Sequence, residues 1–525
     1  MNKNRVFKFT RFSVIVMVLV SLLLGCTAGG SSSSAGSNDE EFVFIVRALG
    51  SPQTFHPDIQ VDDYAYPINL NVYNKLIKLT AANTVLPDLA YDWEFAPDGS
   101  SLTFYLQEGV KWHDGEPFTS ADVKWTYDMM KQENWNSALA MASVSSIECP
   151  DDYTVVFNLD YVDASILYRL SWYGTDIMPK HIYEGTDTAT NPANEAPIGT
   201  GPFKFESWEK GVAVTLVKNP DFWGPEPEID KLVFQEIVDQ TTAYQAFING
   251  EIDYLGSMPT ENLFDLVDNP NYTLVDVPQI QRVYISFNMK DELTSQLAVR
   301  KAIALAIDQA DITNRVGGVS LQGHYFISPM FADYIDDRYT VPETDLEEAV
   351  RVLEEAGFTK DSDGYYFTIN FDFFQQKNYV DVAQVIQGNL AKVGIKVVLN
   401  LQEISAWQQK VMADDDFQMA MNAGFQGPDV SGINNRLMTD GNVNIPNYSN
   451  PEFDALCTEG VKYFDVEDRK YYYSEIQRIM SEDLPMLIVF DEVYRYPLKA
   501  EFTGYPLTTS DKAGSGEWTY LKKAD

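Results

Sequence analysis

The residue types that usually catalyse reactions or bind metals are few and widely spaced in this sequence. Its four histidines, His56, His113, His181 and His324, lie dozens of residues apart and show none of the spacings typical of a zinc site. The chain has no GxSxG nucleophile elbow, no GxxxxGK[ST] phosphate loop and no HExxH helix. We therefore expect no catalytic residue, no metal site and no cofactor, and we predict that the protein is not an enzyme.

Two short motifs resemble ligand loops but lack the required residues. In the stretch DSDG at 361–364, a calcium loop with Gly364 at its sixth position would have Thr359 first and Asn370 twelfth, so two acidic ligands are missing. The stretch GTGP at 199–202 has no following lysine or helix, and it predicts a turn before a strand. A pair of glycosidase carboxylates is defined in space and not in sequence, so a secreted hydrolase stays as a distant alternative.

Cys26 follows a sequence typical of an export signal. It follows four basic residues and an apolar run from Phe12 to Leu24, which at about 13 residues is shorter than the roughly 20 that a membrane span needs. Residues 1–25 are therefore predicted to be a signal peptide. The stretch LLGC at 23–26 resembles the bacterial lipobox, which implies a lipid on Cys26 and residence on the cell surface or the periplasmic side of a bacterial membrane.

The composition limits the number of domains and the kinds of partner that the rest of the chain can have. Residues 26–40 are small and polar and predict a flexible tether. The whole chain of 525 residues is 45% apolar, which supports large cores and two or more lobes. Its formal net charge of −39 repels phosphate backbones, so we expect no nucleic acid partner. Cys149 and Cys457 could be free or paired.

Hydrophobic patterns predict alternating strands and helices. Apolar residues alternate at 42–46, 102–106 and 212–216, which is typical of strands. Helices are predicted after Thr119, with Asp122 completing a capping box, and between an N-cap at Thr344 and a stop at Gly357. The second half predicts strands at 365–374, 395–401 and 417–425, with helices at 382–394 and around Trp407, and a buried strand at 486–490. We expect a mixed α/β fold.

Several motifs point to one family. They are LTFYLQEGVKWHDGEPFTSADVKWTYD at 102–128, GTGPF at 199–203, NPDFWG at 219–224, VYISFN at 283–288 and VRKAIALAID at 299–308. In these stretches, and in their order from about residue 42 to 523, the chain resembles family 5 of the extracellular solute-binding proteins. These are the oligopeptide and dipeptide receptors of ABC importers.

The resemblance implies a two-lobed periplasmic-binding-protein-like fold of type II, cluster C, often called a Venus flytrap, with an extra subdomain in the first lobe. Lobe 1 would take residues 41–287, with the subdomain at about 81–194. Lobe 2 would take 288–489, and 490–525 would return to lobe 1. The chain would cross near Phe287–Asn288 and near Val489–Phe490. Such a receptor captures a solute by hinge closure and presents it to a membrane permease; we expect a monomer.

The ligand-binding residues are expected where the family binds its solutes. Peptide-binding members use an aspartate after a Gly-Trp pair to hold the ligand's amino terminus. The matching segment here is shorter, with Phe425 in place of the tryptophan, Gln426 near the anchoring position and Asp429 at a later acidic element. Dipeptide receptors carry an arginine for the ligand carboxylate, but the matching segment 373–376 has none.

Neutral side chains replace these charged anchors. Gln375, Gln376 and Gln426 offer amide donors and acceptors that suit peptide amides or sugar hydroxyls equally. Phe374, Trp407 and Phe425 are predicted to offer aromatic faces on which a ligand stacks. Ser51 and Gln53, in a first-lobe loop, complete the predicted site. The sequence thus predicts a lipid-anchored receptor for oligopeptides, with oligosaccharides as the alternative ligand.

Overall fold

The computed structural model describes residues 41–59, 64–80, 84–256, 260–263, 265–267, 269–316, 320–376, 378–504 and 516–524. The predicted signal peptide, the tether and Cys26 lie outside these ranges. Residues 42–525 form one unit, separate from residues 1–41. Within the described ranges, no helix is both long and apolar enough to span a membrane.

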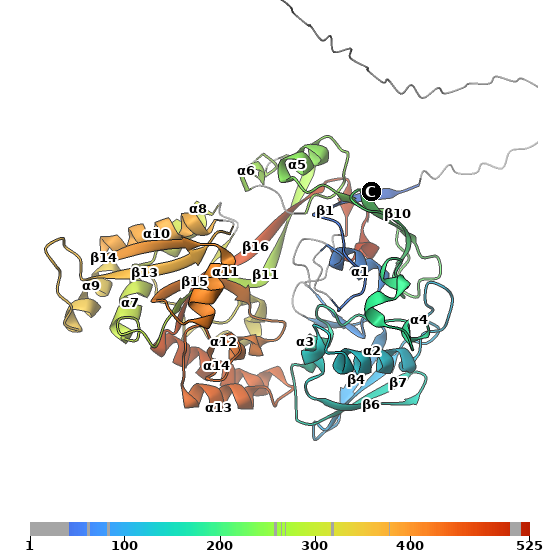
Figure 1. Ribbon diagram of the computed structural model, residues 1–525, viewed down its shortest axis with the longest axis horizontal. Helices are drawn as coiled ribbons and strands as arrows, with labels where there is room; N and C mark the ends of the chain where they lie inside the picture. The colour runs from blue at the N-terminus through green and yellow to red at the C-terminus, as the bar shows by residue number, and fades with distance from the viewer. Residues whose placement is uncertain are drawn as a thin grey trace, which may run out of the picture. The chain divides into compact units, whose positions relative to one another are not determined.

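The first lobe is built on a four-stranded sheet in the order β1-β10-β9-β8, of which β1 and β10 are labelled in Figure 1. Strand β1 (Val43–Ala48) pairs in parallel with β10 (Lys231–Glu236), and β9 (Ala213–Lys218) and β8 (Phe203–Glu209) follow in antiparallel order. Alternate residues of β1, Phe44 and Val46, are buried in a core that also holds Trp518 from the end of the chain. This alternation confirms the strands predicted at 42–46 and 212–216.

Other elements of the first lobe surround this sheet. They are α1 (Tyr66–Val72), β2 (Ile77–Leu79), β3 (Val85–Pro87), α5 (Gln240–Ile248), α6 (Thr260–Leu263), β17 (Phe502–Thr503) and β18 (Lys522–Lys523).

A second, antiparallel sheet with its own core carries the inserted subdomain. Its strands are ordered β4-β5-β7-β6, with bounds Ala90–Phe95, Ser101–Leu106, Thr154–Leu159 and Val144–Asp151. Helix α2 (Ser120–Gln132) packs on it, and α3 (Ile166–Leu170) and α4 (Lys180–Tyr183) follow. The predicted capping box is confirmed: the Thr119 amide donates to the Asp122 carboxylate at 2.9 Å, and the Thr119 side chain caps the first turn.

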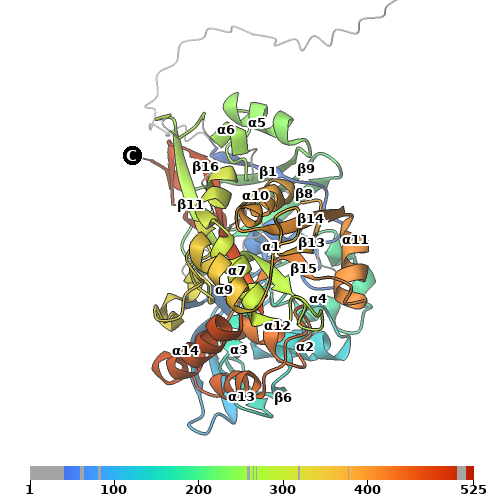
Figure 2. The ribbon, with the colours of Figure 1, turned by 90° about the vertical axis from the view of Figure 1, so that its left-hand side faces the viewer.

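The second lobe is built on a six-stranded sheet in the order β12-β16-β11-β15-β13-β14. The bounds are Leu321–Gln322, Met486–Lys499, Tyr272–Phe287, Met419–Phe425, Phe367–Phe374 and Ile395–Gln402. Strand β13 is parallel to β14 and β15, with α10 (Tyr379–Lys392) connecting β13 to β14. This confirms the predicted βαβ unit. Helix α10 covers one face of these strands and α11 (Ile404–Trp407) the other (Figure 2).

Further helices surround this sheet. They are α7 (Leu297–Ala306), α8 (Gln309–Arg315), α9 (Leu346–Glu355), α12 (Asn434–Leu437), α13 (Pro451–Gly460) and α14 (Val466–Asp483). The N-cap of α9 differs from the prediction, because Asp345 accepts from the Glu348 amide at 2.9 Å, while the Thr344 hydroxyl donates to the Ile307 carbonyl. A carboxylate is the stronger acceptor for a helix N-terminus, and the threonine is used for tertiary packing instead.

The long strands β11 and β16 belong to both lobes. They are antiparallel neighbours along most of their length and lie side by side in both views (Figures 1 and 2). Tyr496 and Leu498 of β16 pack into the first-lobe core, whereas Val283 of β11 and Ile488 of β16 belong to the second-lobe core.

The change from one core to the other therefore falls inside these strands. It lies between Val275 and Val283 on β11 and between Phe490 and Tyr496 on β16. The lobe boundaries predicted from the resemblance, near Phe287–Asn288 and near Val489–Phe490, stay predictions. An apolar strand shared by two cores has no break in composition, so its pattern does not mark where the partner sheet changes.

Candidate functional site

Two of the predicted ligand segments lie at the same edge of the second-lobe sheet. Strands β13 and β15 are parallel, so the residues that end and follow them, 374–376 and 425–426, meet at their carboxyl edge. Phe425 pairs with Gln281 of β11, so the shared strands leave the sheet at this edge too. The fold therefore brings the predicted residues to the side of the sheet from which the chain passes to the first lobe.

Gln426 is buried and held in one orientation by an arginine. Gln426 is 2% exposed, and its side-chain Oε1 accepts a hydrogen bond from Nη1 of Arg282 at 3.2 Å. Its Nε2 is buried with no hydrogen-bond partner among the described residues. Because the amide oxygen is already engaged, the group that remains for a ligand is a donor. A buried donor of this kind costs about 1–3 kcal/mol until it finds an acceptor.

Arg282 is itself fixed by a buried ion pair between the two shared strands. It lies on β11, and its Nε and Nη2 contact the carboxylate of Asp491 on β16. It also donates to the carbonyls of Phe326, at 2.8 Å, and Tyr325, at 2.6 Å. The guanidinium is thus saturated, and it links the strands between the lobes to the predicted ligand residue Gln426.

Asp429 is already bound within the protein. Both of its carboxylate oxygens accept from Arg469, at 2.7 and 2.9 Å, and one also accepts from the Ser431 amide. Arg469 in turn lies over the rings of Tyr334 and Tyr473. Burial alone would raise the pKa of the Asp429 carboxyl, but Arg469 and Ser431 hold it below its ordinary value. Its contact with a ligand stays a prediction, and its observed contacts are structural.

The predicted aromatic residues form part of the second-lobe core. Phe374 lies 5.0 Å from Trp407 and 5.3 Å from Tyr379 between ring centroids, and all three are buried. The indole Nε1 of Trp407 and the hydroxyl of Tyr379 are buried with no hydrogen-bond partner in the part of the chain that the structure describes. Burial raises the pKa of Tyr379, so its hydroxyl stays protonated and able to donate.

The remaining predicted residues are more exposed or are held by other contacts. Gln375 is exposed, and Gln376 is half-buried with its carbonyl accepting from the Tyr379 amide at 2.9 Å. The Ser51 hydroxyl donates to Glu236 and accepts from the Gly211 amide, which ties this first-lobe loop to the sheet. Gln53 is exposed, and the side chain of Phe425 lies outside the described part of the structure.

Three residues at this edge were not predicted from the sequence: Arg282, Tyr379 and Arg436. Nη1 of Arg436 donates to the Tyr284 hydroxyl at 2.5 Å, and a Cβ added to Gly424 would lie 2.3 Å from Nη2 of Arg436. Glycine at 424 therefore leaves room for the guanidinium. An arginine inside an apolar strand, as Arg282 is, signals a buried ion pair, but its partner could not be identified without the fold.

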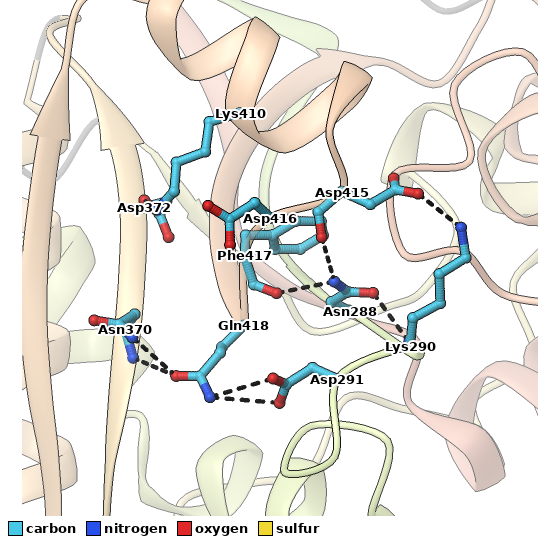
Figure 3. A pocket seen from close by; sticks show the side chains of 10 residues that line it. All are labelled: Asn288, Lys290, Asp291, Asn370, Asp372, Lys410, Asp415, Asp416, Phe417 and Gln418. Atoms are coloured by element: carbon cyan, nitrogen blue, oxygen red, sulfur yellow. Dashed lines mark hydrogen bonds and ion pairs between the residues drawn. The ribbon is translucent and has the colours of Figure 1, made fainter.

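A separate polar pocket of about 390 Å³ lies on the second lobe, lined by charged and amide side chains near the start of β15 (Figure 3). None of the predicted ligand residues lines it. The described residues include no group of three or more His, Cys, Asp or Glu side chains that could hold a metal ion. Cys149 and Cys457 are free thiols, which settles the question that the sequence left open.

The profile of a family described as "Bacterial extracellular solute-binding proteins, family 5 Middle" matches residues 84–444. The chain is 28% identical over 520 residues to the oligopeptide-binding protein AppA of Bacillus subtilis, with 94% of each chain covered. It is 26% identical over 511 residues to the heme-binding protein A of Haemophilus influenzae, which covers 91% of this chain and 92% of that protein. A solved structure of the Bacillus subtilis AppA in complex with a nonapeptide is 25% identical, with a TM-score of 0.70 over 92% of this chain and 100% of that one.

Proposed function

The chain belongs to family 5 of the bacterial extracellular solute-binding proteins, and on this premise we propose that it captures oligopeptides between its two lobes and delivers them to the permease of an ABC importer. The match to an oligopeptide-binding protein over 94% of both chains supports peptides as the ligand class. The likeness to the structure that holds a nonapeptide supports it further.

The observation that carries the proposal is the set of unpartnered donors near the carboxyl edge of β13 and β15. Nε2 of Gln426, Nε1 of Trp407 and the hydroxyl of Tyr379 are all buried without an acceptor within the described ranges. Two buried acids of this region are engaged, because Asp491 pairs with Arg282 and Asp429 pairs with Arg469. Such a surface favours a ligand rich in acceptors, and the carbonyl oxygens of a peptide backbone meet that requirement.

Oligosaccharides are the second candidate, because hydroxyl oxygens also accept hydrogen bonds and aromatic rings can stack on sugars. The same donors would serve both ligand classes. Calorimetric titration separates them: we expect saturable binding of components of a peptide mixture and none of cello- or manno-oligosaccharides. Haem should be titrated as well, because one relative is a heme-binding protein. Mass spectrometry of the molecule that co-purifies with the protein identifies the class independently.

The proposal includes binding without turnover. The ligand recovered after incubation with the purified protein should have the same mass as the ligand added. Time-dependent cleavage products would favour the hydrolase alternative and contradict the proposed receptor role.

We further propose that the protein is held at the outer face of a bacterial membrane by a lipid on Cys26, with residues 26–40 as the tether. Two acyl chains anchor a protein stably, whereas one chain binds only marginally. Cys26→Ala should therefore move the protein from the membrane fraction to the soluble fraction, while Cys149→Ala should not. Membrane attachment that persists in Cys26→Ala would contradict lipidation.

A further inference from the structure

The polar pocket in Figure 3 lies at the opposite end of β15 from Gln426. It is lined by the segment 415–418, directly before β15, by Asn370 and Asp372 of β13, and by residues after β11. Strand β15 has seven residues, which span about 20 Å. The pocket is therefore about 20 Å from Gln426 along β15, whereas on β13 its residue Asp372 is two residues before Phe374.

Asp372 places a buried carboxylate oxygen at this pocket. Its side chain has no exposed surface, and its Oδ1 accepts from Nζ of Lys410 at 2.6 Å and from Nε2 of Gln402 at 2.8 Å. Its Oδ2 is buried and has no hydrogen-bond partner among the residues that the structure covers. Asp372 lines the pocket and lies beside it in the close view (Figure 3). An unsatisfied carboxylate oxygen is costly, and a donor entering the pocket would remove that cost.

The rim of the pocket carries further negative charge. The lining has four aspartates, Asp291, Asp372, Asp415 and Asp416, against two lysines, so its net charge is −2. The lysines are paired within the lining, Lys410 with Asp372 and Lys290 with Asp415 at 2.7 Å. Asp291 accepts from neutral donors, including Nε2 of Gln418 at 3.4 Å, and Asp416 is exposed. The pocket therefore favours a cation.

The kind of cation follows from the geometry of the lining. A metal ion is disfavoured, because the described residues include no group of three or more His, Cys, Asp or Glu side chains placed to hold one. A primary ammonium group carries its charge together with three N–H donors, one of which can meet Asp372 Oδ2. The burial of Asp372 and the exposure of Asp416 place one carboxylate at the base and another near the opening.

We propose that this pocket binds the primary ammonium group of a small organic cation, with the head group donating to Oδ2 of Asp372 and the rest of the molecule leading out past Asp416. The pocket shares no lining residue with the proposed solute site at the carboxyl edge of β13 and β15. Its volume of about 390 Å³ suits a molecule of the size of a short diamine.

The test is calorimetric titration of the purified full chain with 1,4-diaminobutane, with tetramethylammonium as the cation that lacks N–H donors. We expect saturable binding of the diamine at one site, and binding of tetramethylammonium weaker by about tenfold or more, because it makes no charged hydrogen bond. Absence of saturable diamine binding at millimolar concentrations, or equal binding of the two cations, would overturn the proposal.

Variants locate the binding site. Asp372→Asn should weaken diamine binding by about tenfold or more, since it replaces a buried charged acceptor. Asp363→Asn is the matched control, because it makes the same change at an exposed turn of the same lobe and should leave binding unchanged. Asp416→Asn removes a rim charge without disturbing the buried pair and should weaken binding by about twofold to fivefold. It keeps the proposal testable if Asp372→Asn does not fold.

A second readout separates this site from the solute site. Gln426→Met should leave diamine affinity unchanged, whatever it does to peptide binding. Diamine binding that is lost in Gln426→Met but kept in both Asp372→Asn and Asp416→Asn would place the cation at the carboxyl edge and refute the pocket.

Discussion

At the carboxyl edge of β13 and β15 the second lobe holds buried donors without acceptors, whereas near the start of β15 it holds a buried acceptor without a donor. The donor at the carboxyl edge is Nε2 of Gln426, and the acceptor near the start of β15 is Oδ2 of Asp372. Both side chains are positioned by a cation that uses their other polar atom, Arg282 in one case and Lys410 in the other. In both places a neighbouring cation selects which atom of a buried side chain is left for a ligand.

The two supporting cations differ in how far they are removed from water. Arg282 is fully buried with Asp491, while the side chain of Lys410 is 32% exposed beside the pocket. The ammonium group of Lys410 is therefore partly screened by water, whereas the Arg282–Asp491 pair is not. Breaking the Arg282–Asp491 pair should therefore cost more folding stability than breaking the Lys410–Asp372 pair. This is the largest effect that we predict.

Asp491→Ala should destabilise the protein by about 3–5 kcal/mol, because it leaves the Arg282 charge buried and unpaired. Lys410→Met should cost less, about 1–2 kcal/mol, because the ammonium group that it removes is already partly exposed to water and Asp372 keeps its hydrogen bond from Gln402. Urea unfolding followed by tryptophan fluorescence measures both. Arg351→Ala, at an exposed ion pair on α9, is the control and should change stability by less than about 1 kcal/mol. Equal losses for Asp491→Ala and Lys410→Met would break the comparison.

The two edges should also act independently on solute binding. Gln426→Met keeps the length of the side chain but removes its amide, and it should lower peptide affinity by about tenfold, which is the value of one buried hydrogen bond. Asp372→Asn should change peptide affinity by no more than about threefold, since Asp372 lines the separate pocket and acts on the solute site only indirectly, through Phe374 two residues along β13. Calorimetry with the peptide identified by mass spectrometry checks both. A comparable loss in the two variants would show that the edges are coupled.

The smallest expected effect concerns the pH dependence of the Asp429–Arg469 pair. The pKa of Asp429 is held below its ordinary value of 3.8, so the folded state favours its charged form. The resulting stability is present above about pH 4 and is lost as the pH falls below that range toward the lowered pKa. The stability difference between the natural chain and Asp429→Asn should therefore shrink, by about 1 kcal/mol, when unfolding is measured near pH 3 instead of pH 7. A difference that grows in acid would contradict the lowered pKa.

Much of the local structure could be predicted from the sequence because its causes are local. Alternation of apolar residues placed the strands at 42–46 and 102–106, and the Thr119–Asp122 spacing placed the start of α2. The N-cap of α9 was misplaced by one residue, because the sequence does not show that the Thr344 hydroxyl is used by the Ile307 carbonyl. Neighbours along the chain set a helix start, but a tertiary contact decided between two adjacent capping residues.

The candidate site could be predicted only in part. The segments 374–376 and 425–429 were expected to approach a ligand, and the parallel pairing of β13 with β15 does bring 374–376 and 425–426 to one edge. The role of each side chain could not be assigned, because its partner is far away in sequence. Asp429 meets Arg469 and Gln426 meets Arg282, at separations of 40 and 144 residues.

The sequence by itself determined the family, the order of strands and helices and the expected export and anchoring of the chain, because motifs, periodicity and a basic-apolar-cysteine leader are properties of neighbouring residues. Only the tertiary structure decided where the chain passes from one core to the other, which carboxylates are neutralised and which polar atoms remain without partners. Those properties depend on burial and on contacts between distant segments, and a buried charge or donor acquires its energy only from the groups that the fold places beside it.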